Sequence, residues 1–155
     1  MLFTHNLKIL ILMEGSKSIH AIAYFNLLKT SSWIEEQIKT ALKPFNLTHS
    51  QLNVLHVLMV NDPQPVSSSD LKKKILVSNP DMTRLLDRLV KKDFVYRNTC
   101  PENRRKLDIS LTDNGRRLFT EAHSAAKQSL GNFFEDKISE AEATEMRRIL
   151  HKLRE

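Results

Sequence analysis

The spacing of apolar residues changes from helical to strand-like near residue 93, and this change limits the possible folds more than any other feature. Before it, one helix face carries apolar side chains three or four residues apart: Met82, Leu85, Leu86, Leu89 and Val90. After it, the runs 94–98 and 107–111 have the period and composition of strands. Residues 99–106 connect these runs and end in three consecutive basic residues. The sequence therefore predicts a helix followed directly by a β-hairpin with a basic tip.

The rest of the chain is predicted to be helical, because three glycines and five prolines leave little room for loops or an all-β fold. The first helix runs from about Ser16 to Leu42 and ends at Pro44. Capping residues predict four further helix starts, at Thr48, Ser67, Thr112 and Ser139. We therefore expect a mostly α fold with one small β-hairpin.

Composition indicates one soluble globular domain, since 155 residues are 41% hydrophobic and 27% charged. The single cysteine, Cys100, excludes an internal disulfide and favours a reducing cytoplasm. Apolar runs fall short of the roughly 20 residues that cross a membrane. The apolar segment 7–13 lacks a charged leader and a cleavage site, so it does not resemble a signal peptide. We expect a cytoplasmic protein without a membrane partner.

Patterns that indicate catalysis or cofactor binding do not occur in the sequence. The six histidines show no paired metal-ligand spacing, and each is assigned a surface or packing role. The sequence also contains no phosphate-cradling glycine loop and no nucleophile arrangement. We therefore expect no enzymatic activity, no metal and no cofactor.

The net charge is confined to one third of the chain. Residues 67–117 contain 13 Lys and Arg against seven Asp and Glu, a net charge of +6, whereas the remainder contains 11 of each. A basic face on a neutral body is typical of a nucleic-acid binder. The alternative is a lysine-rich solvated surface, which charge alone does not exclude.

Two short helices joined by a tight turn near residues 76–81 predict a helix-turn-helix, whose second helix enters the major groove. Asn79 is suited to pair with adenine, and Arg84 to donate two hydrogen bonds to guanine. Farther along the helix, Arg88 and Lys91 are expected to contact phosphates. The residues predicted to read or position the major groove are Ser78, Asn79, Asp81, Thr83, Arg84, Arg88 and Lys91.

The hairpin tip predicts a second contact, because an arginine there can enter the adjacent minor groove. The predicted wing residues are Asn103, Arg104, Arg105 and Lys106. A basic tip alone is usually a solubility feature, but its position directly after a helix-turn-helix favours double-stranded DNA as the partner. The alternative is a winged-helix module that docks proteins, whose affinity would barely depend on salt.

Two motifs in these elements resemble the MarR family of transcriptional regulators. They are Thr83-Arg84-Leu85-Leu86-Asp87-Arg88-Leu89 and, after the wing, Leu111-Thr112-Asp113-Asn114-Gly115. The resemblance covers residues 47–115 in motif detail, and the flanking helices agree in layout. It implies a winged helix-turn-helix with N- and C-terminal dimerisation helices, a homodimer and repression of a nearby promoter. It also implies release from DNA when a small molecule or an oxidant binds.

The sequence departs from the family pattern in the wing, where Asn103 stands in place of the usual aspartate that would orient an arginine. Arg105 remains the residue expected in the minor groove. Oxidant-sensing relatives carry a cysteine in the first helix, which this chain lacks, and Cys100 in the wing is interpreted as incidental. Tyr24 and Trp33 are candidates for an effector pocket, although packing at the core or the dimer interface is the favoured alternative.

The resemblance also predicts how the chain is divided. Residues 1–46 and 112–155 are expected to form the helical dimerisation region. Residues 47–111 are expected to form the winged helix-turn-helix, in one intertwined domain. A two-fold dimer would place its recognition helices roughly 10 base pairs apart and would require a pseudo-palindromic operator.

Overall fold

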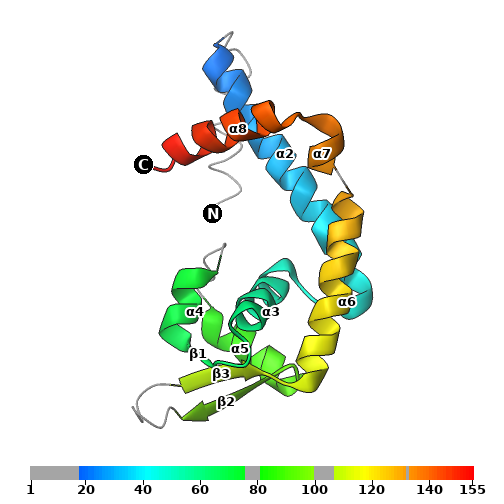
Figure 1. Ribbon diagram of the computed structural model, residues 1–155, viewed down its shortest axis with the longest axis vertical. Coiled ribbons are helices and arrows are strands. Elements are labelled where there is room, and N and C mark those ends of the chain that lie inside the picture. Colours follow the sequence, from blue (N-terminus) through cyan, green and yellow to red (C-terminus); the bar gives the residue numbers. More distant parts are fainter. Residues whose placement is uncertain (1–17, 76–80, 100–106, 132) are drawn as a thin grey trace. The chain divides into compact units, whose positions relative to one another are not determined.

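The computed structural model describes residues 18–75, 81–99, 107–131 and 133–155. The chain forms two compact units, residues 1–36 and 37–155, and most of the described structure lies in the second. The elements in chain order are α2 (Ile19–Leu42), η1 (Lys43–Phe45), α3 (His49–Asn61), β1 (Val66–Ser67), α4 (Ser68–Lys74), α5 (Met82–Lys91), β2 (Val95–Thr99), β3 (Leu107–Leu111), α6 (Asp113–Leu130), α7 (Phe133–Lys137) and α8 (Glu140–Lys152) (Figure 1).

Local hydrogen bonds explain where several helices begin. The Thr48 hydroxyl accepts from the Gln51 amide at 3.2 Å, and Gln51 Oε1 accepts from the Thr48 amide at 3.0 Å, which completes a capping box. Ser139 and Glu142 form the same reciprocal pair before α8. Ser67 caps α4 and Thr112 caps α6, each by accepting from the amide three residues later. The four predicted helix starts are therefore confirmed.

The small sheet has three antiparallel strands in the order β1-β3-β2, one more than the sequence predicted. The additional strand β1 is only two residues long, and Val66 pairs with Ile109 of β3. Strand β3 occupies the predicted residues, whereas β2 begins one residue later than expected. Phe94 does not join the strand because its amide donates to the Leu89 carbonyl of α5 at 3.0 Å, which makes Phe94 part of the C-terminal end of that helix.

Gly115 allows the start of α6 to lie directly on the loop between α5 and β2. A β-carbon at this position would collide with the carbonyl oxygen of Phe94. The Thr112 hydroxyl fixes the same approach by donating to the Asp93 carbonyl at 2.7 Å. The Thr-x-x-Gly spacing of the sequence therefore serves both the helix cap and the close packing of α6 on the loop between α5 and β2.

The core of residues 37–155 is built around α3, which packs against α4, α6 and β3. Its fully buried side chains come from helices and sheet alike: Leu42, Val54, Leu55, Leu58, Leu71, Leu89, Val95, Ile109 and Leu111. In α5, four members of the predicted stripe are buried, but Val90 is 39% exposed. The prediction for Val90 is wrong because eight residues at about 100° each turn it roughly 80° away from Met82.

Candidate nucleic-acid interface

Helix α5 presents a polar side to solvent because its apolar side is held by the core. Thr83, Arg84, Arg88 and Lys91 are all exposed, while Met82, Leu85, Leu86 and Leu89 are at most 7% exposed. Burial of the apolar stripe thus fixes the rotation of the helix about its axis. Four side chains predicted to contact DNA therefore lie on one accessible helix surface.

Asp81 is the N-cap of α5 and also limits the freedom of Arg84. One of its oxygens accepts from the Arg84 amide at 3.4 Å, and the other lies 3.4 Å from Arg84 Nε. The two side chains are 51% and 78% exposed, so solvent screens this ion pair and it contributes little stability. The Arg84 guanidinium can therefore exchange Asp81 for another acceptor at small cost.

Arg97 connects the β-hairpin to α5, a role that the sequence reasoning missed. This β2 residue donates through Nη2 to the Asp87 carboxylate at 2.8 Å and to the Thr83 carbonyl at 3.4 Å. Its side chain is 22% exposed, and its Nε is buried without a partner among the described residues. Arg97 neutralises the acidic group on the outer side of α5 and fixes the first strand of the hairpin against the helix.

Several predicted contact residues lie outside the described residues. These are Ser78 and Asn79 before α5, together with Asn103, Arg104, Arg105 and Lys106 in the wing; Cys100 falls in the same segment. The strands on either side of the wing are described, and they remain paired up to Thr99 and Leu107. The hairpin that carries the wing is therefore defined in its strands.

A cavity of about 240 Å³ lies between the start of α3 and the outer side of α5. It is lined by Thr48, Ser50, Gln51, Asp81, Arg84, Leu85 and Arg88. Three of these residues, Asp81, Arg84 and Arg88, were predicted from the sequence to read or position the DNA. The contribution of α3 was not predicted, because its residues are about 35 positions away along the chain.

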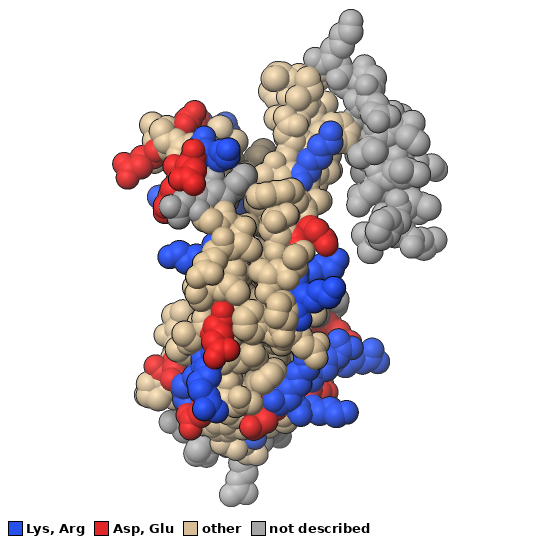
Figure 2. Space-filling view, turned by 90° about the vertical axis from the view of Figure 1, so that its right-hand side faces the viewer, with Lys and Arg blue, Asp and Glu red and all other residues tan. Residues whose placement is uncertain are grey.

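Three consecutive lysines form the last turn of α4, directly before the segment that leads to α5. Lys72, Lys73 and Lys74 are exposed; Lys73 pairs with Asp70 at 3.4 Å, and Lys74 donates to Asn61 Oδ1 at 2.8 Å. The sequence reasoning counted their charge but did not assign them a contact. Figure 2 shows the opposite side of this unit, which carries α6; there too basic side chains lie toward the end that contains the sheet, with acidic side chains among them.

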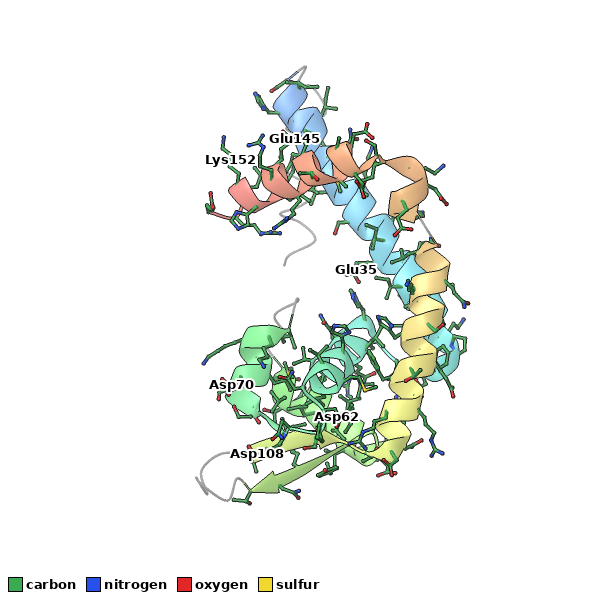
Figure 3. The ribbon with its side chains drawn as sticks, in the orientation of Figure 1. Glu35, Asp62, Asp70, Asp108, Glu145 and Lys152 are labelled. Carbon is green, nitrogen blue, oxygen red and sulfur yellow. The ribbon has the colours of Figure 1, made fainter. Side chains whose placement is uncertain are left out.

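An ion pair joins Asp62, the C-cap of α3, to Arg116 in the first turn of α6. Arg116 donates to both carboxylate oxygens of Asp62 at 2.8 Å, and also to Asp113 (Asp62 is labelled in Figure 3). The hydrogen bonds from Arg116 lower the pKa of Asp62, and Asp62 in turn raises the pKa of Arg116. This bidentate pair supports the scaffold on which α5 and the sheet are placed.

The candidate effector residues lie on α2, where Tyr24 and Trp33 are 40% and 42% exposed. Tyr24 makes an edge contact with Phe25, with ring centroids 5.7 Å apart. Within the described part of the chain, no group of three or more His, Cys, Asp or Glu is placed to hold a metal ion. The described helices also include none that is both long and apolar enough to cross a membrane.

The buried stripe of α5, the preceding short helix α4 and the paired strands β2 and β3 define a winged helix-turn-helix protein. Residues 47–107 match the family model described as the MarR family. This match covers the region in which the sequence motifs resemble the same family of transcriptional regulators.

Proteins with similar sequences or structures match this chain along most of their length. An HTH-type transcriptional regulator of Bacillus anthracis is 26% identical over 125 residues, which are 81% of this chain and 82% of that protein. A MarR-like transcription regulator from Bacillus cereus has a similar structure, with a TM-score of 0.75 and 18% identity over 87% of this chain and 95% of that one.

A mutant MarR from E. coli, solved in complex with operator DNA, is also similar in structure. Its TM-score is 0.74 at 24% identity, over 90% of this chain and 99% of that one. The predicted fold class, a mostly helical winged helix-turn-helix, is therefore confirmed.

Proposed function

We propose that this protein is a transcriptional regulator that binds a pseudo-palindromic operator in double-stranded DNA as a homodimer. Residues 47–111 form its DNA-binding region, and residues 1–46 and 112–155 form its dimerisation region. In this proposal Ser78, Asn79, Asp81, Thr83 and Arg84 read or position the major groove. Arg88 and Lys91 contact phosphates, and Asn103, Arg104, Arg105 and Lys106 form the wing contact.

The observation that carries the proposal is the orientation of α5. Its apolar residues are buried in the core, so the cationic side chains Arg84, Arg88 and Lys91 are exposed together. A helix with this orientation, next to a hairpin, matches the way that winged helix-turn-helix proteins present a recognition helix to the major groove. The similar E. coli protein was solved with operator DNA, which supports the same partner here.

The dimer rests on two helices whose apolar side chains are exposed. On α2, Ile19, Ile22 and Leu28 are 43–70% exposed; on α8, Ile149 is 44% exposed, and Leu153 at its C-cap is 69% exposed. A second copy of the chain would cover these side chains by a two-fold arrangement. Binding of two half-sites by one dimer then follows from symmetry.

Regulation follows the family pattern in this proposal. The dimer represses transcription by occupying an operator near a promoter, and a small-molecule effector releases it. Tyr24 and Trp33 are the aromatic side chains proposed to contact that effector.

The decisive experiment compares wild type with Arg84→Ala. Bound fragments are first selected from genomic DNA, and the affinity of each protein for the recovered site and for random duplex is then measured at several salt concentrations. Wild type should lose orders of magnitude in affinity between low and high salt. Arg84→Ala should lose about 1–3 kcal/mol of binding to the selected site and less on random DNA. Equal binding of both sequences by both proteins would contradict the proposal.

A further inference from the structure

The cavity between α3 and α5 contains a polar side chain that is almost completely buried. Gln51 is only 5% exposed, yet it lines the cavity together with Arg84 and Arg88. A buried amide normally uses both its oxygen and its nitrogen in hydrogen bonds, because an unpaired polar group is costly away from water. The hydrogen bonds of Gln51 therefore indicate what the cavity is suited to bind.

The capping box determines which end of the Gln51 amide remains available. The Thr48 backbone amide is a donor, so the atom that accepts its bond at 3.0 Å must be Oε1. The other end is then the Nε2 amino group, which carries two hydrogens. In the part of the chain that the structure describes, no acceptor is recorded for Nε2. The Nε2 group of Gln51 is therefore available as a donor to a ligand in the cavity.

The charged residues around the cavity favour an anion of low charge. Arg84 and Arg88 contribute two positive charges, and Asp81 contributes one negative charge. Asp81 already lies 3.4 Å from Arg84 Nε, whereas Arg88 has no ion-pair partner among the described residues. The Ser50 hydroxyl adds a further possible donor at the positive end of the α3 dipole. The net charge of the lining matches one phosphodiester.

We propose that this cavity is a binding site for one backbone phosphate of the bound DNA, with Gln51 Nε2 and Arg88 donating to its oxygens. The inference rests on the proposed function, since it places the DNA backbone across the outer side of α5. Such a contact fixes the depth and register of the helix in the groove without reading bases. Gln51 joins the capping box of α3 to this phosphate, so the start of α3 becomes part of the interface.

The test uses Gln51→Glu, which replaces the available donor by an acceptor and adds one negative charge. Glutamate also closes capping boxes, so one carboxylate oxygen keeps the bond from the Thr48 amide. The second oxygen replaces the amino group and repels a phosphate. Affinity for the selected site and for random duplex should both fall by the same factor, about 10- to 100-fold. The control is Gln128→Glu on the exposed surface of α6, which has the same change in charge and should bind as wild type does.

A second measurement locates the phosphate on the DNA. Single phosphates of the selected duplex are replaced by neutral methylphosphonates, one position at a time. Replacing the phosphate that lies in the Gln51 cavity should weaken DNA binding by the wild type. The same replacement should have little further effect on DNA binding by Gln51→Glu, because the two changes remove the same contact. If Gln51→Glu fails to fold by its melting curve, the exposed variant Arg88→Gln replaces it. Arg88→Gln should also lower the salt-dependence slope by about 0.9.

The outcomes separate this inference from the function on which it rests. If wild type binds DNA and Gln51→Glu binds equally well with the same methylphosphonate profile, the phosphate site is overturned while the DNA-binding function stands. If wild type binds no DNA at all, the proposed function itself fails. Inorganic phosphate is titrated in the absence of DNA as a third arm. If phosphate stabilises the wild type against unfolding but does not stabilise Gln51→Glu, and if both proteins have the same affinity for DNA, the cavity binds a free anion and its assignment to a DNA phosphate is overturned.

Discussion

Helices α5 and α8 have the same kind of sequence pattern but different surroundings in the fold. Each begins at a capping residue and carries apolar side chains three or four residues apart. In α5 the side chains of Met82, Leu86 and Leu89 are 0–3% exposed, whereas in α8 those of Met146 and Ile149 are 38% and 44% exposed. The pattern therefore predicts that a helix has an apolar side, but not which partner covers that side.

The apolar sides of the two helices therefore have different partners in the proposed dimer. The stripe of α5 is covered by the same chain, and this fixes the direction of its cationic side chains. The stripe of α8 remains available to a second copy, which the proposed dimer supplies. An exposed apolar patch of this kind is typical of an interaction surface.

The largest expected effect comes from placing a charge in the exposed stripe of α8. Ile149→Glu should convert the dimer to a monomer, because each copy loses roughly 1.5–3 kcal/mol of apolar burial and the two-fold interface loses it twice. DNA affinity should fall with it. Sedimentation at micromolar concentration measures the change.

The matched control is Thr144→Glu, which adds the same charge to another side of α8 and should leave a dimer. A wild-type protein that sediments as a monomer, or an Ile149→Glu variant that remains a dimer, would show that α8 has no such partner.

The next effect tests the covered stripe of α5. Leu86→Ala should lower the free energy of unfolding by about 2–5 kcal/mol, since it leaves a cavity in the core. Val90→Ala, at the exposed edge of the same helix, should change it by only about 0.5 kcal/mol. Denaturant unfolding measures both values. Similar losses in the two variants would mean that Val90 is covered in solution.

A smaller effect, on the salt dependence of DNA affinity, distinguishes the lysines of α5 from those of α8. Lys91→Ala should reduce the slope of log affinity against log salt by about 0.9 and weaken all DNA sequences alike, because it removes one phosphate contact. Lys152→Ala on α8 should leave the slope unchanged. A parallel decrease in both variants would indicate that the basic surface acts through net charge alone.

The smallest effect concerns two ion pairs and their dependence on pH. Hydrogen bonds from Arg116 lower the pKa of Asp62, and hydrogen bonds from Arg148 lower the pKa of Glu145 on α8. A carboxylate with a lowered folded pKa stabilises the fold above its unfolded pKa of about 4, and this contribution is lost as pH falls through the folded value.

Asp62→Asn should therefore lower the melting midpoint near neutral pH, and the difference from wild type should shrink as the solution is acidified toward about pH 2. Glu145→Gln should barely shift it at any pH, because Glu145 and Arg148 are 54% and 62% exposed and solvent screens them. Melting curves across the acid range measure both. A constant deficit for Asp62→Asn would mean that its ionisation does not contribute.

Much of the fold could be predicted because its signals are local. Capping residues bond to amides three positions away, so Thr48, Ser67, Thr112 and Ser139 identified helix starts without knowledge of the tertiary structure. Strand β1 escaped prediction because two residues carry no period, and their pairing with β3 depends on a partner more than 40 positions away.

The candidate site was predictable only in part, for the same physical reason. Arg84 and Arg88 follow from the position of a polar helix side opposite an apolar stripe. Nothing in the sequence indicated that Arg97 would hold Asp87, or that Gln51 would face the same cavity as Arg88.

The sequence by itself determined four helix starts, the two strands of the hairpin, the confinement of positive charge and the motifs that resemble the MarR family, because these depend on residues that are neighbours along the chain. Only the tertiary structure decided which apolar stripe is covered, how α5 is rotated and which distant groups meet at its outer side. Those outcomes depend on contacts between segments that are far apart in sequence, and packing, not local pattern, selects them.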